Sequence, residues 1–488
     1  MADGPDANKV LQLQGEAELR RRFDRAAGDS QTPLTLTHGS DQDVAGCIAA
    51  DLQVRFGEVV HAEGAFHAWR GTHWAELMPE QLHPFISKYD GAAYRDTNNR
   101  VRKFSLNKTR HTSILYLLRH ELEAPGFFEM PALGLACRSG FLAVDAAGHV
   151  RCLPHSPEQK TRHMVVANWR PELDGQAPEG SLLNTLLAGC FQGDAEADKK
   201  RLLLGELTGA AAFGLGTRLT EPKAVILLGE SAGNGKSQMM KAIGGLLPAS
   251  AVSAITPAEL AREQRRAQLA GKLLNAADEL GPAAIRSDTF KAVVTGDTVS
   301  GKTVYKVPAE FRPCALHVFS TNMLPPFQED MDRGVRRRLQ ILTFDRTIPA
   351  AERIAGIGEQ IAANERDLLL AFAVVGAQRL IRQGGFTETR SGQEKLASWV
   401  LMSDAVAAFF RDADAVSLTG ADQDRVTSKA AYSAFQVWAK REGLLPAQVP
   451  THTQFTMRAK ALDLEGLTVR RHAKGTLFKG SKLLVMGT

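Results

Sequence analysis

The sequence predicts an α/β fold, in which a parallel-sheet core is flanked by a mainly helical N-terminal domain and a small C-terminal domain of helices and strands. Three observations predict this fold. Short apolar runs alternate with amphipathic helix patterns in the middle of the chain. A glycine-rich turn joins the first of these runs to a helix pattern. Finally, 488 residues are too many for one compact core, and roughly 150 residues per domain suggests about three domains.

The composition is that of an ordinary globular protein. Hydrophobic residues make up 44% and charged residues 23%, which excludes collagen-like, disulfide-scaffold and wholly disordered chains. No run approaches the ~18 apolar residues of a membrane-spanning helix, and the start shows no secretory signal, so we expect no membrane partner. Five cysteines, never two to four residues apart, argue against a zinc knuckle and favour a reducing, cytoplasmic location. The formal net charge of +5 permits nucleic-acid binding without requiring it.

Changes of pattern along the chain predict five segments. We expect a polar arm, a mainly helical domain, the α/β core, a helical lid with a linker, and a C-terminal domain over residues 1–40, 41–180, 181–350, 351–394 and 395–488. The clearest strands of the core are Ala224–Leu228, Leu273–Ala277, Ala315–Phe319 and Gln340–Phe344. A basic stretch from Arg95 to His111 is interpreted as a solvated face, with contact to DNA as the alternative.

A glycine-containing loop follows the first clear strand and precedes a helix that starts with Lys-Ser. Its glycines let backbone N–H groups close on phosphate oxygens, and the helix N-terminus favours negative charge. We expect Lys236 to reach the β- and γ-phosphates of ATP and the Ser237 hydroxyl to hold Mg²⁺. Five residues separate Gly229 from Gly235 where four are usual, and position 230 is Glu, so a turn without nucleotide is the alternative. The predicted nucleotide-binding residues are Gly229, Gly233, Asn234, Gly235, Lys236 and Ser237.

Two further strand ends carry polar residues suited to ATP hydrolysis. Asp278 and Glu279 end a strand 42 residues after Lys236 (278 − 236). There Asp278 would hold the Mg²⁺ shell and Glu279 would polarise the attacking water, a solvated acidic turn being the alternative. Asn322 ends the next strand, where its amide can bond the γ-phosphate and the lytic water, although Asn before a Pro-rich loop is also a common turn former.

Four arginines precede the last strand of the core. Guanidinium groups at this place can reach a nucleotide held by a neighbouring subunit, as an arginine finger acting in trans. Arg338 is the first candidate and Arg337 the second. The alternative is a solvated or DNA-facing surface.

These elements together resemble the superfamily 3 helicases, in the branch of satellite-phage and poxvirus primase-helicases. The matching residues are 233–237, Leu273–Leu280, Phe290-Lys291, Thr295–Asp297, Thr321–Pro325 and Arg337–Leu339 leading to Phe344. The resemblance implies an AAA+-like P-loop ATPase core and a hexameric ring that uses ATP and Mg²⁺ to move along single-stranded DNA. It also implies forked DNA and a primase or other replication protein as partners, in replication of a phage or other mobile element inside a bacterial host.

The resemblance also implies two DNA-binding elements. A hairpin over Gly296–Lys306 matches the channel hairpin of the family, with Lys302, Tyr305 and Lys306 as candidate contacts, an exposed turn being the alternative. The segment that begins at Val426 resembles a winged-helix domain, whose basic wing would bring Arg470, Arg471 and Lys474 to DNA phosphates. A protein-docking winged helix is the alternative there.

The function we expect is therefore that of an ATP-dependent DNA helicase. Two rival hypotheses remain, namely a related ATPase that remodels protein and an origin-binding scaffold that uses ATP only to assemble.

Overall fold

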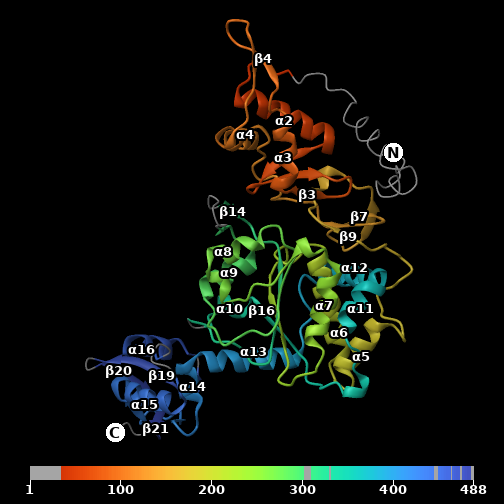
Figure 1. Ribbon diagram of the computed structural model, residues 1–488. Helices are drawn as coiled ribbons and strands as arrows, with labels where there is room; N and C mark the ends of the chain where they lie inside the picture. The colour runs from red at the N-terminus through yellow and green to blue at the C-terminus, as the bar shows by residue number, and fades with distance from the viewer. Residues whose placement is uncertain are drawn as a thin grey trace. The chain divides into compact units, whose positions relative to one another are not determined.

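The computed structural model describes residues 35–301, 309–328, 331–444, 449–462, 464–472 and 475–484 (Figure 1). The chain divides into two compact units, and each is described by itself. The first unit runs through Arg70 and resumes over Trp74–Phe127, and the second comprises Gly71–His73 and everything from Phe128 onward. Within the described residues, no helix is both long and apolar enough to cross a membrane.

The first unit mixes helices and short strands. Its elements are α2 (Asp41–Phe56), β1 (Val59–Ala62), β2 (Ala65–Trp69), β3 (Trp74–Leu77), α3 (Pro79–Ser87), β4 (Ala93–Arg95), β5 (Val101–Lys103) and α4 (Lys108–Glu121). The Ser40 side chain caps α2 by accepting from the Asp43 amide. Buried Ile48 and Leu52 on α2 belong to one core with Ile114 of α4. We expected one domain over 41–180, but this core ends with α4 because the strands that follow belong to the second unit.

The second unit starts with a four-stranded sheet and two helices. The sheet has the order β8-β7-β6-β9, and these elements are β6 (Gly134–Cys137), β7 (Gly140–Val144), β8 (Val150–Leu153), β9 (Met164–Val165), α5 (Leu182–Phe191) and α6 (Ala197–Ala212). The apolar residues at three- and four-residue steps over 182–213 are thus divided between two helices. Helix α6 packs closely on α12 (Arg366–Gln383), where a Cβ at Gly376 would collide with the backbone of Gly205.

A five-stranded sheet forms the centre of the second unit, and all of its strands are parallel. Its order is β11-β12-β15-β10-β16, with β10 (Ala224–Leu228), β11 (Val252–Ser253), β12 (Leu274–Ala277), β15 (Leu316–Thr321) and β16 (Leu339–Thr343). The four strands expected from the sequence are all present, and the predicted α/β class is confirmed. They were recognisable because strands buried on both faces are continuous apolar runs.

Helices and a hairpin surround this sheet. They are α7 (Lys236–Leu246), α8 (Glu263–Arg266), α9 (Ser287–Thr295), β13 (Val299–Gly301), β14 (Ala309–Phe311), α10 (Arg333–Arg336), α11 (Ile357–Asn364) and α13 (Arg390–Ser403). Single 3₁₀ turns occur at Pro157–Gln159, Ala249–Ala251, Glu259–Ala261, Ala267–Leu269 and Ala350–Glu352. Within the lid and linker expected over 351–394, the linker between α12 and α13 is short, because α12 ends only at Gln383, where Gly384 adopts a left-handed conformation.

The last part of the chain builds a small core of its own. Its elements are α14 (Ala405–Arg411), β17 (Val416–Leu418), β18 (Arg425–Thr427), α15 (Ser428–Arg441), α16 (His452–Ala461), β19 (Thr468–His472), β20 (Gly475–Lys479) and β21 (Ser481–Leu483). Phe409, Phe435 and Phe455 pack together at its centre. The Thr427 side chain caps α15 by accepting from the Ala430 amide.

Candidate functional site

The carboxyl end of the five-stranded sheet gathers the polar residues predicted from the sequence. The loop Gly229–Gly235, called the glycine loop below, follows β10, while Asp278 follows β12 and Asn322 follows β15. In this sheet β10 and β15 are neighbours, and their onward connections lead to opposite edges, to β11 and to β16. Open parallel sheets bind ligands outside the carboxyl ends of strands at such a switch point.

The glycine loop has a backbone that only glycine allows at its key positions. Gly233 and Gly235 have φ of 73° and 90°, and Gly235 stands directly before the first residue of α7. A Cβ at Gly229 would collide with Asn234 and Lys236. The loop is therefore wrapped tightly enough for its own amides to approach a bound group.

The Lys236 side chain reaches from the start of α7 back into the glycine loop, and its Nζ bonds three oxygens. Its side chain is 6% exposed, and Nζ donates to Gly229 O at 3.1 Å, Asn234 Oδ1 at 2.9 Å and Asn322 Oδ1 at 3.0 Å. Burial lowers the pKa of the Lys236 ammonium, and the Asp278 carboxylate opposes that shift. The structure thus brings Lys236, Asn322 and Asp278 together, although they are far apart in the sequence.

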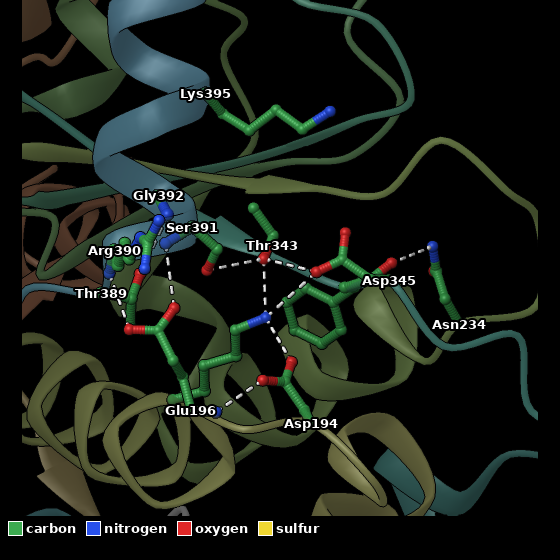
Figure 2. Close-up of polar contacts among 12 residues, drawn as sticks. Asp194, Glu196, Asn234, Thr343, Asp345, Thr389, Arg390, Ser391, Gly392 and Lys395 are labelled. Atoms are coloured by element: carbon green, nitrogen blue, oxygen red, sulfur yellow. Dashed lines mark hydrogen bonds and ion pairs between the residues drawn. The ribbon is translucent and has the colours of Figure 1, made fainter.

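Asn234 ties the glycine loop to the end of β16. It is 3% exposed, and its Nδ2 donates to Ser231 O at 2.7 Å and to Phe344 O at 3.3 Å (Figure 2). The Asn234 side chain therefore shapes the loop. Ser237, by contrast, lies in the first turn of α7 and is half-buried.

Glu279 has a strained backbone. Its φ is 54°, a left-handed conformation that costs a non-glycine residue about 1 kcal/mol or more. The neighbouring hydrogen bonds hold it, since the Glu279 amide donates to Asp278 Oδ1 at 3.0 Å and the Leu280 amide donates to Ser320 O at 3.0 Å. Both carboxylates of the pair are exposed at the end of β12.

The two arginine-finger candidates lie at the opposite end of the sheet. Arg338 directly precedes β16, whose first residue pairs with Ala224 at the start of β10. Because β10 has five residues at about 3.3 Å each, Arg338 is separated from the glycine loop by about 16 Å of sheet. A guanidinium at that distance belongs to a different site from Lys236 of the same chain.

Arg338 itself is half-buried and incompletely paired. One Nη donates to Gly334 O at 2.7 Å, while the buried Nε has no partner among the described residues. Burial lowers the pKa of the Arg338 guanidinium, and the nearby Arg337 adds to that shift. Arg337 is exposed and lines a cleft of about 680 Å³ together with Arg333 and Arg336.

A cation that the sequence did not reveal lies beside the glycine loop. Lys395 of α13 donates from Nζ to Glu230 Oε1 at 2.5 Å, and both residues line a cavity of about 900 Å³ with Asn322. Glu230 is the residue found where a glycine is usual. Its partner is 165 positions away, so only the folded chain shows the pairing.

A buried lysine stabilises the segment to which the loop is attached. Lys200 of α6 is fully buried, and its Nζ donates to Asp194 Oδ2 at 2.6 Å, Thr343 Oγ1 at 2.6 Å and Asp345 Oδ2 at 3.2 Å. Figure 2 shows the three acceptors converging at the end of β16. This network fixes the carboxyl end of β16 next to Asn234.

The predicted DNA-binding residues are described only in part. Strands β13 and β14 pair as the arms of the expected hairpin, with Val299 opposite Phe311, but Lys302, Tyr305 and Lys306 lie outside the described residues. Arg470 is exposed on β19 opposite Leu477 of β20. Arg471 follows it in the strand without a described side chain, and Lys474 lies outside the description.

Comparison with known proteins finds one family model and several solved structures. A family of unknown function (DUF5906) matches residues 227–338, which span the glycine loop through Arg338 but less than half of the chain. Among solved structures, three apo structures of the NrS-1 C-terminal region are 14%, 15% and 13% identical, with TM-scores of 0.45, 0.46 and 0.41. Each alignment covers 90% of this chain and 98% of the other. No curated protein matches. We draw nothing on function from these likenesses.

Proposed function

We propose that this chain is an ATP-hydrolysing motor that acts on DNA, with an active site completed by a second copy of the chain. The observation that carries the proposal is the convergence of Lys236, Asn322 and the glycine loop at the carboxyl end of the parallel sheet. A buried ammonium whose bonding partners are neutral oxygens suits an anionic ligand, because phosphate oxygens are stronger acceptors than carbonyl or amide oxygens.

The residues at this end of the sheet fit ATP with Mg²⁺. When bound, Mg²⁺ would supply neutralisation of the negative charge of the triphosphate during hydrolysis. Ser237 and Asp278 would hold the ion, and Lys236 would leave Gly229 O for the phosphates. Glu279 would orient and polarise the attacking water, while Asn322 would contact both that water and the terminal phosphate.

The second half of the site comes from another subunit in this proposal. Arg338, with Arg337 as the second candidate, would neutralise charge on the phosphates held by the adjacent glycine loop. A repeated contact between the loop of one copy and the arginines of the next is a head-to-tail interface, which closes into a ring. We propose a hexamer, following the superfamily 3 resemblance.

The proposal assigns contact with DNA to two hairpins, β13–β14 and β19–β20. In the proposal, hydrolysis moves the hairpin between β13 and β14 along single-stranded DNA, through Lys302, Tyr305 and Lys306, and thereby unwinds forked DNA. The C-terminal domain would act as a winged helix that contacts phosphates through Arg470, Arg471 and Lys474. The resemblance extends this to replication of a phage or other mobile element, with a primase or other replication protein as partner.

Steady-state ATP hydrolysis with and without single-stranded DNA tests the proposal. We expect DNA to raise the turnover of the wild type and Lys236→Ala to abolish it. Turnover that a protein partner stimulates and DNA does not would favour the protein-remodelling hypothesis. ATP binding without turnover under any DNA condition would contradict the motor and favour the origin-binding scaffold.

A further inference from the structure

A hairpin of the first unit carries an unusual share of the charge of the chain. Strands β4 and β5 pair with Ala93 opposite Lys103, and α4 follows directly (Figure 1). Residues 93–110, called the basic hairpin below, contain six basic residues and one acidic residue, a net charge of +5. The whole chain also has a formal net charge of +5. Outside this segment the numbers of basic and acidic residues are therefore equal, and the net positive charge of the chain equals that of this one segment.

Asp96 is the only acidic residue of the basic hairpin, and its carboxylate accepts hydrogen bonds from residues of the same hairpin. Asp96 Oδ1 accepts from the amides of Asn98 at 3.0 Å and Arg100 at 2.9 Å, and Oδ2 accepts from Arg102 Nε at 3.1 Å. These bonds, led by that of the Arg100 amide, lower the pKa of Asp96. Asp96 therefore fixes the turn and pairs with one cation, which leaves the others without a carboxylate of the hairpin.

Four of the other cations have no ion pair among the described residues, whereas the half-buried Arg110 pairs with Asp41 at 3.5 Å. Arg100, Lys103 and Lys108 are exposed, and none has a side-chain hydrogen bond or ion pair within the described part of the chain. Arg95 bonds only the turn, donating to Asn99 O at 3.1 Å and to Asn99 Oδ1 at 3.3 Å. Cations that no described carboxylate neutralises are available to an external anion.

The register in which β4 pairs with β5 places two of these cations on the same face of the hairpin. Arg95 lies opposite Val101, and Lys103 is two residues further along β5, so these three residues share one face. On the other face Tyr94 packs against Gly39, where a Cβ would collide with its ring. The first face is therefore open to solvent, with Val101 63% exposed between two cations. Figure 1 shows the hairpin projecting from α2 and α4 of the same unit.

We propose that the basic hairpin binds the sugar–phosphate backbone of a nucleic acid. A regular row of phosphates is the partner that fits a projecting hairpin with four cations lacking an ion pair among the described residues, because each contact releases a counterion from the strand. The binding is independent of sequence, since backbone contacts position a protein without reading bases. This goes beyond the proposed motor, because none of the proposed ATP-binding or catalytic residues belongs to the first unit.

The test measures binding of the full chain to labelled single-stranded DNA by fluorescence anisotropy, without nucleotide and in a Lys236→Ala background. This background makes the result independent of ATP turnover, so a failed hairpin and a failed motor are distinguishable. The variant is Arg100→Ala/Lys103→Ala. The matched control, Arg55→Ala/Arg119→Ala, removes two exposed cations of the same unit outside the hairpin.

We expect the hairpin variant to raise Kd about tenfold and to reduce the slope of log Kd against log salt by about 1.4, at about 0.7 for each lost contact with a single strand. The control should keep the wild-type values, and the charge-preserving Arg100→Lys/Lys103→Arg variant should bind normally. Single-stranded RNA should show the same loss if the backbone phosphates are recognised. Equal Kd and slope in the hairpin and control variants would overturn the proposal. So would a loss confined to a poly-glutamate probe, which would assign the hairpin to an acidic protein.

Discussion

The two ends of the five-stranded sheet differ in how their charged groups are satisfied. At the carboxyl end, Lys236 bonds three oxygens and lies near Asp278, so the cation is enclosed by its own chain. At the amino end, the Arg337 and Arg338 guanidiniums have no ion pair within the described residues, and Arg338 Nε lacks any partner there. The carboxyl end therefore encloses its lysine, whereas the amino end holds Arg338 near Asp297 and Asp332 without an ion pair among the described residues. In the proposed function this difference is what requires two subunits, because each end of the sheet supplies groups that the other end lacks.

Removing the central cation of the carboxyl end should have the largest effect. Lys236→Ala should lower ATP turnover at least 1,000-fold, because the terminal phosphates lose the charge that stabilises them in the transition state. Turnover and ATP binding should be measured together with thermal unfolding. Lys241→Ala is the matched control, since Lys241 lies on the same helix and, among the described residues, forms an ion pair only with the exposed Glu359. If Lys236→Ala turned over ATP at the rate of this control, the glycine loop would not be a phosphate site.

Removing the first finger candidate should have the next largest effect. Arg338→Ala should lower ATP turnover by about 1,000-fold and leave ATP binding within a fewfold of wild type, because a finger acts mainly in the transition state. Arg333→Ala is the matched control, as Arg333 is an exposed arginine of the same cluster. A strong loss of ATP binding with unchanged turnover at saturation would contradict this role.

Two variants of Glu279 distinguish the backbone strain at this residue from its proposed role in hydrolysis. Glu279→Gln keeps the positive φ and should lower turnover by about 100-fold or more, because a polarising carboxylate is lost. Glu279→Gly should lower turnover equally but raise the free energy of unfolding by about 1 kcal/mol, because glycine adopts φ of 54° without strain. Denaturant unfolding and steady-state turnover measure the two effects. Equal stability of the two variants would contradict the strain.

The smallest effects should come from the exposed pair beside the loop. Lys395→Ala leaves the Glu230 carboxylate unneutralised next to the phosphates and should weaken ATP binding about threefold. Glu230→Gln frees Lys395 and should tighten ATP binding by a similar factor, and the double variant should return near wild type. Calorimetric titration with a non-hydrolysable ATP analogue measures this. Changes of the same sign in both single variants would contradict the electrostatic explanation.

The sequence predicted the parts of the site that depend on local pattern. The strands β10, β12, β15 and β16 are apolar runs, and the residues just after them fall at one end of a parallel sheet by geometry alone. The break between α5 and α6, and the close of the first unit after Phe127, depend on packing between distant segments and were not predicted.

Polar pairs between residues far apart in the chain could not be predicted from the sequence either. Lys200 reads as an ordinary helix lysine, yet it is fully buried against Thr343, which is 143 residues away. The pairing of Glu230 with Lys395 likewise arises only when α13 packs beside the loop. A local pattern carries no information on which charged residues meet across the fold. The positive charge of the stretch from Arg95 to His111 was evident from the sequence. Its exposure, and the lack of ion pairs for most of its cations among the described residues, became evident only from the folded hairpin.

Mixing two inactive variants tests most directly whether the two ends of the sheet form one active site across subunits. Lys236→Ala retains the arginines, and Arg338→Ala retains the loop. An equal mixture should therefore regain about a quarter of wild-type ATP turnover if the head-to-tail interfaces act independently. Activity should fall toward zero as either variant comes to dominate the mixture. No regained turnover at any ratio, with both variants folded and assembled as wild type, would contradict a site shared between subunits.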